Sequence, residues 1–294
     1  VDDLVAAMGV QTGVSKSEVS RICAGLDKEV EAFRTRSLAH TTFPYVFCDA
    51  TFCKVRVGAH VVSQALVVAT GVSIDGTREV LGTAVGDSES FEFWREFLAS
   101  LKARGLSGVH LVISDAHAGL KTAVAQQFTN SSWQRCRVHF MRNLHTAVAA
   151  KHAPAVTAAV KTIFAHTDPA EVGAQWDRVA DTVAASFPKV AAMMAEAKTD
   201  VLAFTAFPKA HWQKIWSNNP IERLNKEIKR RADVVEIFPN PAAFLRLATA
   251  VVIESHDEWQ VTRRYLSDVS MDDLRAVIAA KHAAAALAKQ HQIT

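Results

Sequence analysis

Three acidic residues stand where their chemistry calls for an explanation. Asp49 lies inside the apolar run 45–52 (YVFCDATF), and Asp115 directly follows the apolar run 111–114 (LVIS). A buried carboxylate is costly unless it has a metal ion, a cationic partner or a raised pKa. Both positions are therefore candidates for metal binding. The alternatives are a hydrogen-bonded core residue for Asp49 and, for Asp115, the N-cap of the helix that follows.

The third acid, Glu222, opens a strongly basic segment. Asn219 and Pro220 are typical of a helix cap and a first helical residue, so Glu222 becomes the third residue of that helix. An acid there can simply close a capping box. Within ten residues, however, five basic side chains against Glu222 and Glu227 give a net charge of +3. A carboxylate in such a helix suits a metal ion together with DNA phosphates, whereas a plain solvated basic helix is the alternative. The predicted DNA contacts here are Arg223, Asn225, Lys226, Lys229, Arg230 and Arg231.

The elements that must position these acids are predicted from the periodicity of the sequence. We expect three antiparallel strands first, then a helix, a strand, a helix and a fifth strand. The expected ranges, in that order, are 45–55, 60–73, 77–85, 88–104, 109–114, 116–128 and 133–138. This order is that of the ribonuclease H-like fold, an α/β fold with a mixed sheet. In that fold the strand before Asp115 lies beside the strand of Asp49.

The flanking segments are predicted to be helical. Residues Ser15 to Glu18 have the form of a capping box, and a shorter helix at 2–8 precedes them, which together predict a helix-turn-helix or a plain αα-hairpin. Its exposed DNA-binding candidates are Lys16, Ser17, Ser20 and Arg21. Later helices are expected from Pro220, at 241–259 and at 271–290. The predicted organisation is a helix-turn-helix segment (1–40), the first part of the core (41–139), an all-helical insertion domain (140–215), the second part of the core (216–262) and a helical tail (263–294).

Composition sets broad limits on the protein. A chain of 294 residues with 49% apolar content is long enough for a large core and two or three modules, and a net charge of +3 alone is weak support for a nucleic-acid partner. Four cysteines without a secretory segment fit a reducing cytosol. No apolar run approaches the roughly 20 residues of a membrane-spanning helix. The chain starts at Val1 rather than Met, which is typical of a fragment or a trimmed chain.

Several short motifs, taken together, carry a family resemblance. They are DAT (49–51), FW (93–94), SDAHAGL (114–120), CRVH (136–139), NPIERLN (219–225) and VVEIFP (234–239). In order and spacing they resemble the Mutator-type family of bacterial insertion-sequence transposases, from about residue 14 to 259. Members of this family usually carry more N-terminal sequence than this chain does. All three acids of the family's catalytic DDE triad have a counterpart here.

The resemblance implies a DNA transposase with two Mg²⁺ or Mn²⁺ ions, which cleaves at insertion-sequence ends and joins them to target DNA. Asp49 would bridge both ions, and Asp115 and Glu222 would each complete one. The implied partners are the terminal inverted repeats and target DNA, bound by a homodimer, and the implied location is the cytoplasm, in association with the nucleoid. Two rivals remain: a ribonuclease H-like nuclease without strand transfer, and a non-catalytic DNA-binding regulator.

Two further motifs are assigned structural roles. Cys136 and His139 provide two of the four ligands that a structural zinc needs, so a buried thiol beside a hydrogen-bonded histidine is favoured over a zinc site. Trp212 and Trp216 flank the third acid and have the chemistry to stack on unpaired bases. Packing in the core is favoured for both, and Trp176 is expected to be a core residue of the helical insertion.

Overall fold

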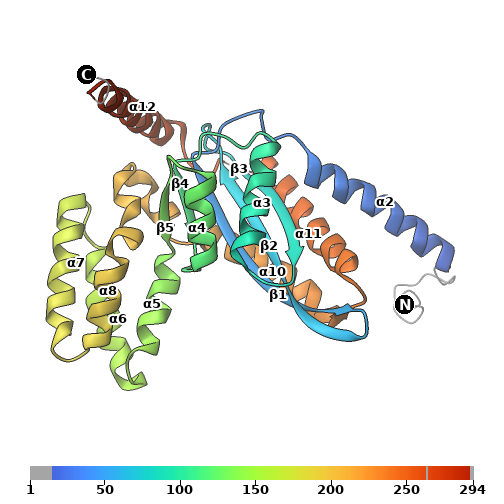
Figure 1. The fold of residues 1–294 in the computed structure, drawn as a ribbon, viewed down its shortest axis with the longest axis horizontal. Coiled ribbons are helices and arrows are strands. Elements are labelled where there is room, and N and C mark those ends of the chain that lie inside the picture. Colours follow the sequence, from blue (N-terminus) through green and yellow to red (C-terminus); the bar gives the residue numbers. More distant parts are fainter. Residues whose placement is uncertain (1–14, 263, 292–294) are drawn as a thin grey trace.

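The protein is a mixed α/β structure built on one mixed sheet (Figure 1). It is described here from a computed structural model, for residues 15–262 and 264–291. Six strands form the sheet within these residues: β1 (Tyr45–Val57), β2 (His60–Val72), β3 (Arg78–Gly86), β4 (Leu111–Ser114), β5 (Ser132–Arg135) and β6 (Ile237–Phe238).

The strands follow the order β3-β2-β1-β4-β5. The first three pair antiparallel, as predicted from the sequence, whereas β4 and β5 run parallel to β1. One edge of the long strand β1 is shared by two partners, since β4 pairs with its first residues and β6 pairs in parallel with Lys54 and Val55. The pairing of β1 with β4 therefore ends at Phe47, two residues before Asp49.

Both faces of β1 are covered, which explains its nearly continuous apolar sequence. Tyr45 and Phe47 point into one core and Val46 and Cys48 into the other, because successive side chains alternate across a strand. The core that contains Val46 also includes side chains of α3 (Phe91–Ala103) and α4 (Ala118–Gln127), and the core that contains Tyr45 includes those of α10 (Asn219–Val235) and α11 (Pro241–Val261). Figure 1 shows the two pairs of helices on opposite faces of the sheet.

A helical segment separates β5 from α10. Its core contains Trp176, which is buried as predicted and stacks on Phe140 at a centroid distance of 5.5 Å. Trp212 is also buried, and its indole donates to the carbonyl of Phe207, so the favoured core role is confirmed for this residue. The helices of the segment are α5 (Arg137–Thr146), η1 (Ala150–His152), α6 (Ala153–Ile163), α7 (Pro169–Ala184), α8 (Pro188–Val201), η2 (Ala203–Ala206), η3 (Lys209–His211) and α9 (Trp212–Ile215).

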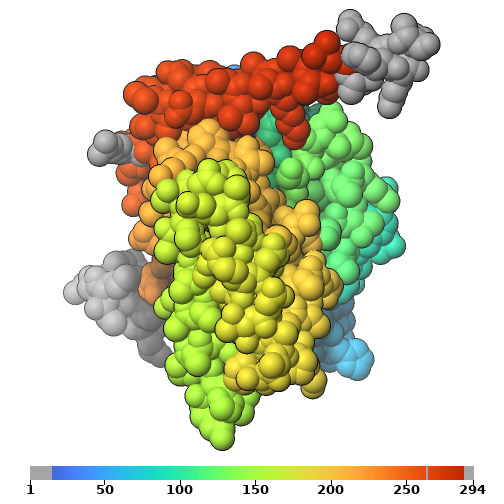
Figure 2. Space-filling view, turned by 90° about the vertical axis from the view of Figure 1, so that its left-hand side faces the viewer, coloured from blue at the N-terminus to red at the C-terminus, as the bar shows by residue number. Residues whose placement is uncertain are grey.

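One helix flanks the core at each end of the chain. In α2 (Lys16–Thr35) the predicted capping box is present, with reciprocal bonds between Ser15 and Glu18. The shorter helix predicted at 2–8 lies outside the described residues. At the other end, α12 (Asp268–His291) crosses the top of the molecule in Figure 2. No helix in the described ranges is both long and apolar enough to span a membrane.

Some predicted element boundaries were wrong. The fifth strand ends at Arg135 rather than residue 138, because Cys136 already caps α5. The predicted helices at 88–104 and 116–128 begin two or three residues later, each after an N-cap whose side chain accepts a backbone N–H. The last helix begins at Asp268, three residues earlier than predicted. The two-residue strand β6 was not predicted at all.

Candidate active site

Asp49 and Asp115 occupy equivalent places on neighbouring parallel strands. Phe47 of β1 is in register with Ile113 of β4, and each acid follows its strand partner by two residues. Because side chains alternate with a period of two, both acids lie on the sheet face of Phe47 and Ile113. The pairing of two parallel strands thus brings two carboxylates together at one end of the sheet.

Glu222 reaches the same place from α10, which packs on that face. The three acids line one cleft with a volume of about 510 Å³. The cleft is lined by Asp49, Ala50, Thr51, Asp115, His139, Arg142, Glu222, Asn225, Lys226, Lys229, Arg230 and Asp233. The three acids singled out in the sequence are therefore neighbours in space, although they are up to 173 residues apart in the chain.

The start of α10 differs from the sequence prediction. Asn218, not Asn219, is the N-cap, and it makes no side-chain capping bond. Its side-chain amide instead donates to the carbonyl of Cys48 at 2.9 Å, and its backbone N–H contacts the Cys136 sulfur at 3.3 Å. Glu222 is consequently the fourth residue of the helix, so the capping-box alternative was wrong. The bond from Asn218 attaches the first turn of α10 directly to β1, beside Asp49.

The capping alternative for Asp115 is also wrong. His117 caps α4, because its Nδ1 accepts the backbone N–H of Leu120 at 3.3 Å. Asp115 instead forms a close ion pair through Oδ1 with Nδ1 of His139. Its carboxylate, about 40% exposed, lies in the wall of the cleft rather than at a helix end.

The environment of Asp49 opposes its ionisation in the metal-free protein. Burial raises the pKa of this carboxyl to about 7, and the negative charge of Asp115 adds to the effect. The side-chain amide of Asn225 opposes it by donating to Asp49 Oδ2 at 2.7 Å. Asn225 is only 8% exposed and lies beside Asp49 in the lining of the cleft, and its role as a DNA contact stays a prediction.

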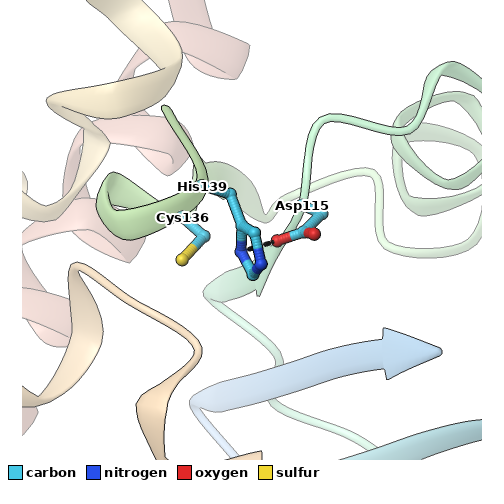
Figure 3. A group of neighbouring side chains, drawn as sticks. All are labelled: Asp115, Cys136 and His139. Atoms are coloured by element: carbon cyan, nitrogen blue, oxygen red, sulfur yellow. Dashed lines mark ion pairs between the residues drawn. The ribbon is translucent and has the colours of Figure 1, made fainter. Parts of the chain in front are cut away.

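The Cys136–His139 pair belongs to the same site. Figure 3 shows the imidazole of His139 between the Cys136 thiol and the Asp115 carboxylate. A hydrogen bond with Asp115, and then one with Cys136, raises the pKa of His139 to about 10. The second ring nitrogen of His139 is 3.8 Å from Glu222 Oε1. Potential ligand atoms of Asp115, Cys136 and His139 lie within 4.8 Å of one another, and Cys136 is fully buried.

Basic side chains form the wall of the cleft along α10. Lys226, Lys229 and Arg230, all predicted from the sequence as DNA contacts, line it. Arg142 of α5 also lines it and was missed, although its place three residues after His139 on the same helix was an available signal. Arg231 does not line the cleft, because it pairs with Glu227 and with Glu254 at 2.6 Å.

The remaining predicted DNA contacts lie away from the acids. Lys16, Ser17, Ser20 and Arg21 are exposed on α2, and none of them lines the acidic cleft. The helix is attached elsewhere, since Asp27 forms a two-bond ion pair with Arg246 of α11. A role of α2 in binding DNA stays a prediction.

Comparison with known proteins assigns this α/β chain to a class. Residues 1–262 match the family model described as "Transposase, Mutator family". The chain is 46% identical over 278 residues to the transposase for insertion sequence element IS1081 of Mycobacterium tuberculosis, covering 95% of this chain and 67% of that protein. It is 38% identical over 261 residues to the transposase for ISRM5 of Rhizobium meliloti (89% and 65%). It is also 38% identical over 257 residues to the transposase for IS256 in transposon Tn4001 of Staphylococcus aureus (86% and 66%).

These matches cover most of the chain and show the family. The chain belongs to the Mutator family of transposases, as the motifs in the sequence indicated. It spans about two thirds of the length of the three relatives named above.

Proposed function

We propose that this chain is the catalytic core of a DNA transposase that cuts DNA at the ends of an insertion sequence and joins them to target DNA. Asp49, Asp115 and Glu222 would be the catalytic residues. The observation that carries the proposal is the meeting of three carboxylates from β1, the end of β4 and α10 in one cleft with a basic wall. The family membership supports the reaction class.

The arrangement of the strands supports a ribonuclease H-like core. In the order β3-β2-β1-β4-β5 only β2 is antiparallel to both of its neighbours, and β4 lies beside β1, as expected from the sequence for the strands of Asp115 and Asp49. In this proposal residues 41–139 and 216–262 form the core, 140–215 are a helical insertion, 1–40 carry a DNA-binding segment and 263–294 form a tail. Because two transposon ends must be brought together, a homodimer is the proposed acting form.

The donor set fits hard divalent cations such as Mg²⁺ or Mn²⁺. Oxygen ligands from three carboxylates are what these ions prefer. Glu222 Oε1 is buried and has no hydrogen-bond partner among the described residues, with His139 Nε2 at the longer ion-pair distance of 3.8 Å, so this oxygen is available as a ligand. Two such ions, when bound, would activate a water or a 3′-hydroxyl and stabilise the leaving oxygen.

The other side chains of the cleft would orient the acids and the DNA. Asn225 holds one oxygen of Asp49, and His139 holds one oxygen of Asp115, so each aspartate has one oxygen fixed by a neighbour. Lys226, Lys229 and Arg142 supply positive charge beside the acids, where a phosphodiester would have to lie. These basic side chains would attract the phosphates of the DNA backbone to one place and so orient the DNA over the acids.

The proposal is tested by cleavage and strand transfer of labelled DNA that carries the terminal repeats of the insertion sequence encoding this chain, with Mg²⁺ or Mn²⁺. Asp49→Asn, Asp115→Asn and Glu222→Gln should each lower the rate by at least about 100-fold, since losing one electrostatic stabiliser of a transition state has this effect. Binding of the DNA should persist in all three.

Asp233→Asn is the matched control, because Asp233 lines the same cleft from the same helix but is not one of the three acids. It should keep most of the activity. Full activity in any of the three acid variants would contradict the proposed site. Cleaved but never joined DNA with the unchanged protein would favour a nuclease instead.

A further inference from the structure

A second cleft lies on the other side of the basic wall. It has a volume of about 620 Å³ and runs between α10 and α11, with Arg78 of β3 at its edge. No acid of the triad lines it. Its lining residues are Arg78, Pro220, Arg223, Leu224, Lys226, Glu227, Arg230, Ser255, Glu258, Trp259 and Thr262.

Arg78 is held rigidly in this cleft by aromatic rings. Its guanidinium lies 3.5 Å from the ring centroid of Trp259 and 5.1 Å from that of Tyr265. An arginine over an aromatic face is attracted to it and loses conformational freedom before any ligand arrives. Its Nε is buried and has no hydrogen-bond partner in the described part of the chain. The chain itself therefore leaves part of the hydrogen-bonding capacity of this guanidinium unused.

The basic side chains that line this cleft outnumber its acids, since Arg78, Arg223, Lys226 and Arg230 stand against Glu227 and Glu258. Within residues 15–262 and 264–291, Arg78, Arg223 and Lys226 form no ion pair. Glu227 is already bound by Arg230 and Arg231, at 2.7 and 3.0 Å. Burial lowers the pKa of Arg78, and the like charge of Arg223 acts in the same direction, while Glu258 opposes it.

The second cleft is continuous with the acidic one along α10. With 3.6 residues per turn, Glu222, Asn225 and Lys229 share one side of the helix, and Arg223 and Glu227 the adjacent side. Lys226 and Arg230 lie between the two sides and line both clefts. A chain of phosphates placed over the acids can therefore cross this ridge and continue into the second cleft without leaving basic surface.

From this geometry we propose that the second cleft binds a backbone phosphate of the same DNA molecule whose phosphodiester lies over the acids, with Arg78 and Arg223 as its ligands. The inference rests on the proposed function and extends it to a residue, Arg78, that no sequence motif singled out. Arginine suits the task because its planar fork pairs with two phosphate oxygens at once. Contact with one phosphate carries no sequence information, so the site would fix the path of the DNA and leave its sequence unread.

The experiment measures the affinity of the whole chain for a short DNA duplex at a series of salt concentrations, in EDTA so that no cleavage occurs. The association constant K falls with salt, so the slope of log K against log[salt] is negative. In the variant Arg78→Gln/Arg223→Gln this slope should become less steep by about 1, which is the loss of one phosphate contact. Arg78→Lys should weaken binding with little change in slope, because it keeps the charge and loses the fork. Arg95→Gln is the control, since Arg95 lies on α3, on the opposite face of the sheet.

The single variant Arg223→Gln guards against misfolding, because Arg223 is exposed on its helix and, unlike Arg78, lies over no aromatic ring in the described part of the chain. It should weaken DNA binding by itself. Unchanged affinity and slope in both the single and the double variant would overturn the inference while leaving the transposase proposal intact. Conversely, an Arg-dependent slope in a protein that never cleaves DNA would sink the transposase proposal and keep the phosphate site. If inorganic phosphate alone, at matched ionic strength, released the bound DNA, the cleft would be a site for free phosphate rather than for a DNA backbone.

Discussion

The side-chain amide of Asn225 donates a 2.7 Å hydrogen bond to Oδ2 of Asp49, joining α10 to β1 at the centre of the acidic cleft. The two residues are 176 positions apart in the chain, and both are largely removed from solvent. A bond to the ionised form favours the charged carboxylate against the cost of burial. Asn225 is therefore a positioning residue for the proposed metal ligand.

Replacement of Asn225 tests this role. Asn225→Ala should reduce DNA cleavage by about 10- to 100-fold, which is typical for the loss of a hydrogen bond to a metal ligand. The loss should be partly reversed by raising the Mg²⁺ concentration, since the ligand itself remains. A titration of cleavage rate against Mg²⁺ separates this from a purely structural defect, which added metal would not rescue.

Asn130→Ala is the control for that titration. Asn130 is exposed, its backbone carbonyl accepts from Lys281, and its side chain forms no hydrogen bond within residues 15–262 and 264–291. This variant should need no additional Mg²⁺. If Asn225→Ala showed the same Mg²⁺ dependence as the unchanged protein, Asn225 would have no part in orienting Asp49.

The raised pKa of Asp49 predicts a pH-dependent stability in the metal-free protein. Its pKa is about 7 in the folded chain against 3.8 for an ordinary carboxyl, so the folded chain binds the proton more tightly between these values. Stability is then lost as the pH rises from about 4 to 7. Asp49→Asn, which keeps an acceptor for Asn225, should be more stable than the unchanged protein at pH 8, by up to about 4 kcal/mol.

Urea unfolding at pH 5 and pH 8 in EDTA measures the effect. The stability gap between Asp49→Asn and the unchanged protein should shrink at pH 5, where the carboxyl is protonated. Mg²⁺ or Mn²⁺ should stabilise the unchanged protein at pH 8 and have little effect on the variant, because a ligand that binds only the folded chain stabilises it. A gap of the same size at both values of pH would disprove the assigned cause.

The sequence predicted the two aspartates because their signals are local. An apolar run interrupted by Asp49 and a short apolar run ended by Asp115 reveal buried strands, and strand pairing then brings the acids together. The same rule placed the three antiparallel strands within one or two residues. Alternating burial is a property of neighbouring residues, so it is visible without any knowledge of the fold.

The contacts of the site were not visible in this way. Asn225 was assigned to DNA because it lies one turn after Glu222, but its burial depends on how α10 is rotated against β1. Asn219 was predicted as the N-cap, but Asn218 takes that position, and tertiary packing brings the side chain of Asn218 to the Cys48 carbonyl. The strand β6 is two residues long and is defined by its pairing with β1, so it is too short to show an alternating pattern in the sequence.

His211 predicts an opposite response to pH. Burial lowers the pKa of its imidazole to about 4, and the ring accepts or donates a 2.7 Å bond with the buried Tyr45 hydroxyl. The unfolded chain, with an ordinary pKa of 6.5, binds the proton more tightly, so this residue's contribution is present above pH 6.5 and lost as the pH falls toward 4. Between pH 7 and pH 4.5 the free energy of unfolding should fall in both proteins, and the fall should be about 1 to 3 kcal/mol smaller in His211→Gln than in the unchanged protein.

Thermal unfolding across this range provides the measurement. His60→Gln, at an exposed position in the β1–β2 hairpin, should follow the unchanged protein. If the unfolding temperature changed with pH by the same amount in the unchanged protein and in His211→Gln, another group would cause the acid sensitivity.

The junction between the β2–β3 turn and α12 depends on Gly76. Its φ of +78° belongs to the left-handed region, and a Cβ added there would overlap the carbonyl oxygen of Leu266. The backbone of Leu266 also donates to the carbonyl of Gly76 at 3.0 Å. Gly76→Ala should therefore separate the start of α12 from the sheet and destabilise the chain by more than the 1–2 kcal/mol expected for left-handed backbone strain alone.

Two other glycines separate strain from steric overlap. Gly58 has φ +60° but nothing within 4 Å of an added Cβ, so Gly58→Ala should lose only about 1 to 2 kcal/mol. Gly25 lies inside α2 and also has open space around it, so Gly25→Ala should stabilise the chain by about 0.5 to 1 kcal/mol. Urea unfolding of the three variants checks this order. Equal losses for Gly76→Ala and Gly58→Ala would mean that the contact with Leu266 contributes nothing to holding α12 in place.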